Sequence, residues 1–351
     1  MAGIVVTPTP ERSTKPIAAG HGGTVVEAEY PAANYINASR QLVTDQPVRA
    51  AAAGREVVAG DPITKPVCIY LPAGYDVRDR TTRYNTLYLL HGVGGNRREW
   101  LDGNRAMDGG FVITNLLDHM IDGGEIAPLI VVFAEGRSSH DWMDTSFNSS
   151  ATNMLGFYYF DYELRHDLIP FIERTYSPCG AAAEPRTHRA LAGLSMGGMQ
   201  ALNLGVGGHR CDAATCVGVP PAWGSGLAAT VLAPGMTDLF AYVGAFSSAP
   251  TTSEGTVLGR SLASSGHGLS LLYVTCGEAD RLLQAGYERS LSGLAEAAGD
   301  RLGDCHQVLI RGGTHNFDVW NNGAYNFVRL AFRTLGERDR PTVLRTTIDP
   351  R

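Results

Sequence analysis

Short apolar runs recur along the chain, and segments with helical periodicity separate them. Residues 86–90 read Thr-Leu-Tyr-Leu-Leu, a run typical of a strand covered on both faces. Residues 161–176 instead place Leu164 and Leu168 on one helical face. The same patterns predict strands over 24–30, 67–71, 129–134, 188–194, 242–246, 269–276 and 306–310, and helices over 111–121, 199–204, 283–298 and 318–335. Strands that alternate with helices predict an α/β fold, with a mostly parallel central sheet and helices on both faces.

The domain organisation follows from length and local composition. The chain has 351 residues, with no internal repeat and no clear linker, so residues 24–351 are predicted to form one domain. Residues 1–23 are rich in Pro, Thr and Gly and are predicted to be a flexible arm. Residues 207–237 are rich in Gly, Pro and Ala and contain two cysteines, which predicts an inserted surface loop or lid.

Composition and charge narrow the function classes. The hydrophobic content of 44% and charged content of 18% are ordinary for a globular protein. A net charge of −6 without a basic run argues against nucleic acid and anionic membranes as partners. No apolar run reaches the length of a membrane span. The first residues lack a basic n-region, so a cytoplasmic location is the simplest expectation. Nothing in the sequence predicts an oligomeric state.

The six cysteines do not indicate a disulfide framework in a chain of this length. Cys211 and Cys216 are close in sequence and could pair if the protein meets an oxidant. The chain contains neither a C-x-x-C nor an H-E-x-x-H motif, so neither a metal site nor a cofactor is expected.

The segment Gly193-Leu194-Ser195-Met196-Gly197 has the form G-x-S-x-G between a predicted strand and a predicted helix. This is the context of a nucleophile elbow, in which a tight turn holds the serine in a strained backbone conformation. A Cβ two residues to either side would clash, and Gly193 and Gly197 lack one. Ser195 is therefore the candidate nucleophile of an α/β-hydrolase fold. The alternative is a glycine-rich turn with a hydrogen-bonding serine.

A second glycine-rich loop, residues 91–96, follows the buried strand at 86–90. It contains neither a dinucleotide-binding G-x-G-x-x-G nor a Walker lysine, so nucleotide binding is disfavoured. Lipases and esterases use such a loop for half of an oxyanion hole. The backbone amide of Val93, with that of Gly92 as the weaker alternative, is expected to pair with the amide of Met196.

A serine nucleophile needs a histidine base, and in α/β-hydrolases the base follows the serine and the acid in the chain. His209 ends the helix after the elbow, and His267 and His306 lie before or at the start of strands, at the wrong edge of the sheet. His315 follows a strand and lies in a glycine-rich loop, so it is the predicted base.

The acid that orients this base should end the preceding strand. Glu278 and Asp280 both follow the strand at 269–276, and Asp280 is favoured. Asp318 is the weaker option, because its place just after His315 predicts a cap for the closing helix.

Four segments together resemble a known family: Tyr88 to Gly95, Ala192 to Gly198, Cys276 to Asp280 and Gly312 to Trp320. They resemble the esterase D-like α/β-hydrolases, with the feruloyl esterases of carbohydrate esterase family 1 as the nearest branch. The resemblance implies a nucleophile at Ser195, a base at His315 and an acid at Asp280. It also implies oxyanion amides at Met196 and Val93.

The resemblance implies ester hydrolysis through an acyl-enzyme but specifies the substrate poorly. Relatives include acetyl-xylan esterases, S-formylglutathione hydrolases, enterobactin-type esterases and mycolyltransferases, so acyl transfer stays an alternative, as does a non-catalytic binding protein. The absence of a signal peptide points to small soluble esters, such as feruloylated oligosaccharides or chlorogenate. Trp142 and Trp223 lie in loops that could line an aromatic pocket, or could simply anchor those loops to the core.

Overall fold

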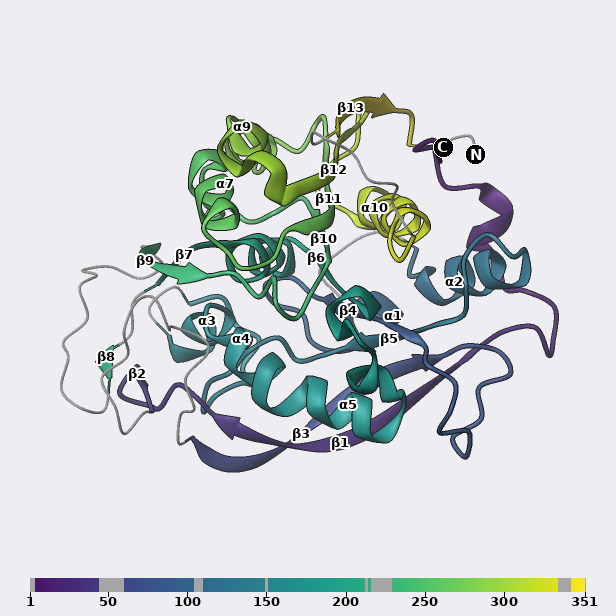
Figure 1. The fold of residues 1–351 in the computed structure, drawn as a ribbon, viewed down its shortest axis with the longest axis horizontal. Coiled ribbons are helices and arrows are strands. Elements are labelled where there is room, and N and C mark those ends of the chain that lie inside the picture. Colours follow the sequence, from purple (N-terminus) through teal and green to yellow (C-terminus); the bar gives the residue numbers. More distant parts are fainter. Residues whose placement is uncertain are drawn as a thin grey trace.

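The computed structural model describes residues 4–43, 60–103, 110–148, 151–211, 214–215, 229–333 and 342–350. Its centre is a nine-stranded sheet with the order β1-β3-β5-β4-β6-β10-β11-β12-β13 (Figure 1). The strands are β1 (Thr24–Asn34), β3 (Asp61–Leu71), β4 (Asn85–Leu90), β5 (Leu129–Phe133), β6 (Arg189–Leu194), β10 (Tyr242–Phe246), β11 (Leu269–Gly277), β12 (Leu302–Ile310) and β13 (Thr342–Ile348). Two short pairs stand apart from this sheet: β2 (Gln41–Leu42) with β8 (Ala214–Thr215), and β7 (Gly207–Cys211) with β9 (Ala229–Pro234).

The sheet is parallel except at one edge. β1 pairs antiparallel with β3, and β3 pairs antiparallel with β5. From β5 onward every neighbouring pair is parallel, including the edge pair β12 and β13. All residues of β5, β6 and β10 are buried, as the continuous apolar runs predicted. The prediction of an α/β-hydrolase fold with a mostly parallel sheet is confirmed.

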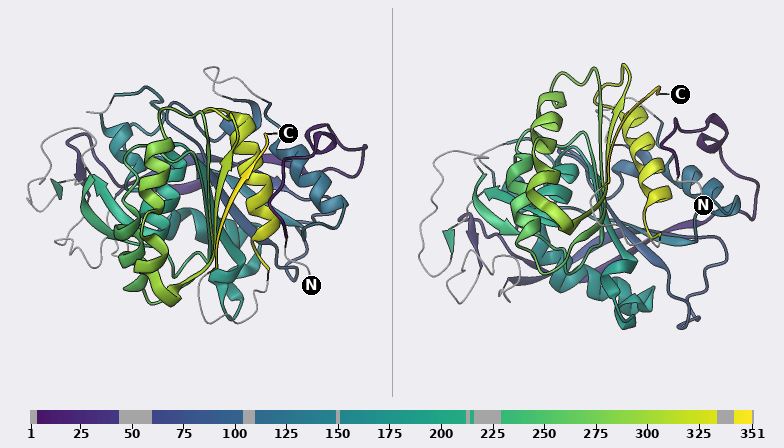
Figure 2. Two further views of the ribbon diagram at one scale, coloured as in Figure 1. Left: turned by 90° about the horizontal axis from the view of Figure 1, so that it is seen from above. Right: turned by 45° about the horizontal axis from the view of Figure 1, so that its top comes forward.

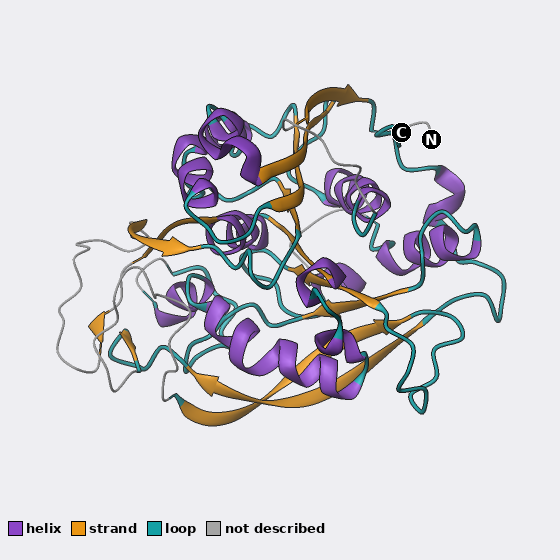
Figure 3. Cartoon of the chain, viewed as in Figure 1, coloured by secondary structure: helices purple, strands orange, loops and turns teal. Residues whose placement is uncertain are grey.

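Helices cover both faces of the sheet (Figures 2 and 3). The hydrophobic core on one face includes residues of α1 (Glu99–Asp102), α2 (Ile113–Asp122) and α10 (Phe317–Leu330). The core on the other face includes residues of α4 (Phe160–Glu163), α5 (Ile169–Thr175), α7 (Gly255–Ala263), α8 (Gln284–Leu291) and α9 (Leu294–Ala298). The remaining helices are α3 (Thr152–Phe157) and α6 (Met196–Gln200). No helix of the described residues is both long enough and apolar enough to span a membrane.

Several helix boundaries differ from the predicted ones. The predicted helix at 161–176 is divided by a π-helical turn, Leu164–Leu168. The predicted helix at 283–298 is broken at Gly293, which has a φ of +69° that favours glycine. The predicted cap at Asp318 is wrong, because the Asn316 side chain accepts a hydrogen bond from the Val319 amide and α10 begins after it.

The N-terminal segment lies against the domain. Val6 is buried, and the Thr7 amide donates a hydrogen bond to Asn326 Oδ1 at 3.0 Å. A 3₁₀ turn, Glu11–Thr14, follows, and the carbonyl of Thr14 accepts from the Asn115 side chain on α2. The predicted flexibility of residues 1–23 stays a prediction, but Val6, Thr7 and Thr14 have defined neighbours in the structure.

The described part of the predicted insertion begins and ends as an antiparallel hairpin of β7 and β9. Arg210 on β7 forms a buried ion pair with Asp161 on α4 at 2.7 Å, and both side chains are 1% exposed. This pair attaches the base of the hairpin to the domain. Cys211 is buried. Trp223 and Cys216 lie outside the described residues, so their predicted roles and the possible disulfide stay predictions.

Candidate active site

Ser195 lies in the turn between β6 and α6, at the carboxyl edge of the sheet. Its φ of +52° and ψ of −113° are unusual for a residue with a side chain, and such strain is typical of functional sites. A Cβ on Gly193 would lie 2.5 Å from the carbonyl carbon of Gly197. A Cβ on Gly197 would lie 2.6 Å from the carbonyl oxygen of His91. Both glycines are therefore required by close backbone contacts.

The structure brings Ser195, His315 and Asp280 into one hydrogen-bonded chain. His315 Nε2 lies 3.3 Å from Ser195 Oγ, and His315 Nδ1 lies 2.8 Å from Asp280 Oδ2. Asp280 is 1% exposed, and the His315 side chain is 20% exposed. Nδ1–H can therefore donate to the carboxylate, which leaves Nε2 to accept from the serine hydroxyl. The Ser195 distance is long for a hydrogen bond, as is common before a substrate binds.

Close contact between two loops positions the acid beside the base. A Cβ on Gly277, at the end of β11, would lie 2.3 Å from the carbonyl oxygen of Gly313 in the loop after β12. The Ala279 amide donates to that same oxygen at 2.8 Å. Glu278, the alternative acid, instead accepts from the Gly312 amide at 3.1 Å. Of the two carboxylates, Asp280 is the one that faces the base.

The other candidate histidines lie elsewhere. His209 is on β7, and His267 precedes β11. His306 is on β12, where its ring stacks on Tyr273 with centroids 6.2 Å apart. Of the four histidines weighed from the sequence, His315 is the one that contacts Ser195.

The glycine-rich loop after β4 lies directly beside the nucleophile. A Cβ on Gly92 would approach the Ser195 Cβ to 3.1 Å and its Oγ to 3.6 Å. The Gly92 amide donates to Glu99 Oε2 at 2.7 Å, so this amide already has a partner. Val93 is therefore the better candidate for an oxyanion donor from this loop. Met196 opens α6 immediately after Ser195, which puts its amide at the same turn.

Three buried titratable groups surround this loop. Burial raises the pKa of Glu99 to about 7, against opposing effects of the Gly92 hydrogen bond and Arg137. Burial, with the positive charge of Arg137, lowers the pKa of His91 to about 3. Burial also lowers the pKa of Arg137 to about 10. The neutral ring of His91 lies between the carbonyls of Gly92 and Glu135, at 2.7 and 2.6 Å, and can donate to one of them at a time.

Two features near Ser195 were not predicted from the sequence: the contact of Glu99 with Gly92, and the aromatic residues from α3 and α4 that pack with Met196. An acidic residue seven positions after Gly92 gives no sequence signal of contact with it, because the loop conformation decides where the side chain goes. Met196 belongs to a buried apolar cluster with Val93 at its edge. Much of that cluster is aromatic and comes from α3, α4 and the residues between them: Phe157, Tyr158, Tyr159 and Tyr162.

Trp142 lies in the loop after β5, and its ring centroid is 5.3 Å from Lys65 Nζ. Lys65 is buried and paired with Glu163 at 2.8 Å. This contact attaches the loop to the sheet, which favours the anchoring alternative for Trp142. A role of Trp142 in substrate binding stays a prediction.

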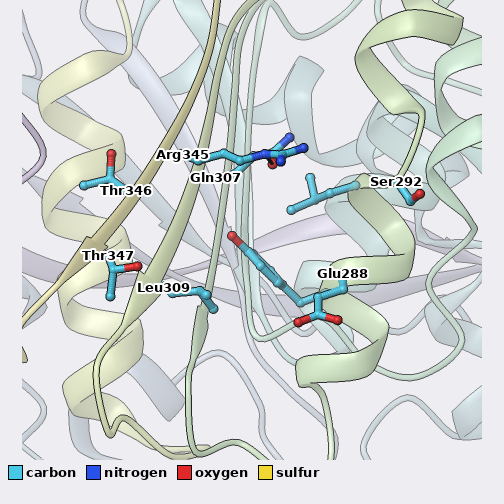
Figure 4. A pocket seen from close by; sticks show the side chains of 9 residues that line it. Glu288, Ser292, Gln307, Leu309, Arg345, Thr346 and Thr347 are labelled. Carbon is cyan, nitrogen blue, oxygen red and sulfur yellow. Dashed lines mark hydrogen bonds between the residues drawn. The ribbon is translucent and has the colours of Figure 1, made fainter.

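A cavity of about 410 Å³ opens between α8 and the last two strands of the sheet, β12 and β13 (Figure 4). Its polar side chains include Arg345, whose Nε donates to Gln307 Oε1 at 3.0 Å. None of the residues that line it belongs to the Ser195 site. In the part of the chain that the structure describes, no cluster of three or more His, Cys, Asp or Glu side chains could hold a metal ion.

The structure combines an α/β-hydrolase fold with a Ser195–His315–Asp280 contact chain, the geometry expected of a serine hydrolase. In the comparison with known proteins, residues 64–208 match the Esterase family model. Endo-1,4-beta-xylanase Y of Acetivibrio thermocellus is 36% identical over 152 residues, which are 41% of this chain and 12% of that protein. An endo-1,4-beta-xylanase/feruloyl esterase of Xylanibacter ruminicola is 33% identical over 135 residues, 38% of this chain and 16% of that protein. The chain thus matches only a small part of these relatives.

Solved structures extend the similarity over nearly the whole chain. The feruloyl esterase module from Clostridium thermocellum, solved as a serine-to-alanine mutant with sinapinate, gives a TM-score of 0.60. It shares 19% identity and covers 96% of this chain and 97% of its own. A ferulic acid esterase of family CE1 from Anaeromyces mucronatus, in complex with ferulic acid, also gives a TM-score of 0.60. It shares 17% identity, and the match covers 95% of this chain and 98% of that one. At these identities the likeness establishes the fold.

Proposed function

We propose that this chain is a serine carboxylic-ester hydrolase of the feruloyl esterase type. The observation that carries the proposal is the continuous contact from Ser195 Oγ through His315 to Asp280. The match to the Esterase family model and the names of the relatives support ester bonds as the target.

The first step is acylation of the nucleophile. Ser195 Oγ attacks the ester carbonyl carbon while His315 Nε2 takes the hydroxyl proton. The proton then passes to the alkoxy leaving group as the C–O bond breaks, which releases the alcohol. Asp280 stabilises the imidazolium and holds Nδ1–H in place. His315 then takes a proton from a water molecule that attacks the acyl-enzyme carbonyl. It returns this proton to Ser195 Oγ as the bond from Oγ to the acyl carbon breaks, which releases the carboxylic acid.

The negative charge that develops on the carbonyl oxygen needs fixed donors. The amides of Met196 and Val93 lie on the two chain segments that meet at Ser195. Each such donor is worth about 3 kcal/mol of transition-state stabilisation.

The preferred substrate is a hydroxycinnamoyl ester of a small soluble alcohol or oligosaccharide. The ferulic acid and sinapinate bound in structures of similar fold support an aromatic acyl group. Trp142 and Trp223 are the tryptophans proposed to contact it.

A substrate panel tests this proposal. Wild type and Ser195→Ala are assayed on methyl ferulate, chlorogenate, 4-nitrophenyl acetate, acetylated xylan and S-formylglutathione. The proposal predicts the highest kcat/KM on a ferulate or caffeate ester and loss of turnover in Ser195→Ala. A higher kcat/KM on acetylated xylan or S-formylglutathione would contradict the proposed hydroxycinnamoyl substrate. Retained activity in Ser195→Ala would contradict the proposed mechanism.

Two further assays separate the alternatives from other classes. Transfer of the acyl group to an added alcohol in preference to water would identify an acyltransferase. Failure of Ser195 to react with a fluorophosphonate probe would identify a non-catalytic binding protein.

A further inference from the structure

We propose that Glu99 is a positioning residue for the oxyanion loop: its bond to the Gly92 N–H holds the His91–Gly92 peptide, which sets the start of the following Gly92–Val93 peptide so that the Val93 N–H faces the nucleophile. The inference rests on the proposed function and deepens it. Glu99 is fully buried and lies in α1, directly after the loop that it contacts.

The Glu99 carboxyl group contacts the oxyanion loop directly. Glu99 Oε2 accepts the Gly92 N–H at 2.7 Å. A Cβ on Gly95 would lie 2.1 Å from the same oxygen, so the loop wraps closely around the carboxyl group. A bond from a buried carboxyl to a backbone amide is costly to lose, because the amide is then left without a partner.

Two contacts of the Gly92 carbonyl set the direction of the next peptide plane, Gly92–Val93. The Gly92 carbonyl accepts from the Gly95 amide at 3.3 Å and lies 2.7 Å from His91 Nδ1. In a planar trans peptide the N–H points opposite to the C=O. Since the Gly92 carbonyl is turned towards these groups, the Val93 N–H is turned away from them. Gly92 itself lies against Ser195, because a Cβ on it would approach the Ser195 Cβ to 3.1 Å. We infer that the Val93 N–H, turned away from the partners of the Gly92 carbonyl, is directed to this side.

The helix that carries Glu99, α1, is attached to β4 through Trp100. Trp100 Nε1 donates to the carbonyl of Leu90, the last residue of β4, at 3.0 Å. The Trp100 ring also contacts Phe317 edge to face at 5.6 Å between centroids. α1 is therefore fixed to the strand that carries the loop, and the Glu99 carboxyl group has a defined position under Gly92.

The test compares Glu99→Ala and Glu99→Gln with a matched control, Asp118→Ala. Asp118 is also a buried carboxylate that accepts a glycine amide at 2.7 Å, from Gly23, but it lies on α2 and touches neither loop of the site. kcat and KM are measured on 4-nitrophenyl acetate, with the Ki of an aryl trifluoromethyl ketone. Ser195 Oγ adds to the carbonyl of that ketone and leaves its oxygen as an oxyanion.

Glu99→Ala is expected to lower kcat about 100-fold with KM within threefold, the loss typical of one oxyanion donor. The Ki of the ketone should rise by the same factor as kcat/KM falls. Glu99→Gln should restore kcat to within about fivefold, because its amide oxygen can accept from Gly92. Asp118→Ala should lower the melting temperature without a change in kcat.

Wild-type kcat in Glu99→Ala, or an equal loss of kcat in Asp118→Ala, would overturn the role of Glu99. If Glu99→Ala does not fold, Glu99→Asp is the test. Its carboxyl group is one methylene too short to reach Gly92, so kcat should fall about tenfold. An unchanged kcat in Glu99→Asp would overturn the inference. Absence of ester turnover in the wild-type protein would instead contradict the proposed function.

Discussion

The two sides of the candidate oxyanion hole are held by different means. On the Met196 side, backbone contacts fix the turn: Gly193 and Gly197 admit no Cβ, and α6 starts at once. On the Val93 side, side-chain contacts from Glu99 and His91 fix the loop. A site can therefore combine one part that backbone contacts determine with another that depends on side-chain contacts.

Replacement of Asp280, the predicted acid, has the largest expected effect. Asp280→Asn should lower kcat about 10⁴-fold, because the amide no longer holds the His315 tautomer that accepts from Ser195. Steady-state kinetics on 4-nitrophenyl acetate measures the loss. Glu278→Gln is the matched control and should stay within about threefold. A larger loss in Glu278→Gln than in Asp280→Asn would show that the acid is assigned wrongly.

Gly197→Ala probes the part built from backbone. The new Cβ would meet the His91 carbonyl at 2.6 Å and push the two sides of the site apart. We expect about 3 kcal/mol of lost stability together with a loss of kcat of at least about 100-fold. Urea unfolding and kinetics on the same preparation test this. Normal activity with normal stability would mean that the turn is not fixed by contact with the loop.

Glu99→Gln has the smallest expected effect on activity, but it should change how stability depends on pH. The pKa of Glu99 rises from its ordinary value of 4.5 to about 7 in the folded state. The folded protein thus holds this proton more tightly than the unfolded chain, so stability falls as the pH rises from about 4.5 to about 7.

Glu99→Gln removes that contribution. The difference in free energy of unfolding between variant and wild type should shift by up to about 3 kcal/mol in favour of the variant from pH 4.5 to pH 8. Urea unfolding across this range measures it. A difference that is independent of pH would show that Glu99 titrates near its ordinary value.

The difference between features fixed by the local backbone and features fixed by side-chain contacts also explains what could be predicted from the sequence. The steric demand at Gly193 and Gly197 is local, so the elbow and its strand are visible in the sequence. The proximity of Asp280 and His315 follows from adjacent parallel strands, whose carboxyl ends meet at one edge of a sheet. In the structure Asp280 contacts His315, and the Gly92 amide is bonded to Glu99. The roles of Asp280 as the acid and of Val93 as an oxyanion donor stay predictions.

Features that depend on tertiary contacts were not predictable in this way. β13 carries no strong periodic pattern and forms where β12 offers a strand edge to extend. Arg210 lies in a segment that reads as a surface loop, yet its guanidinium is buried beside Asp161. The contact of Glu99 with Gly92 likewise depends on a loop conformation that no local pattern encodes.

The most direct test of the central claim is to trap the acyl-enzyme. The protein is mixed with 4-nitrophenyl ferulate, quenched in acid during turnover and analysed by intact and peptide mass spectrometry. The account predicts a feruloyl adduct on the peptide that contains Ser195, absent from Ser195→Ala. Turnover with the adduct on another residue, or undiminished hydrolysis by Ser195→Ala, would contradict it.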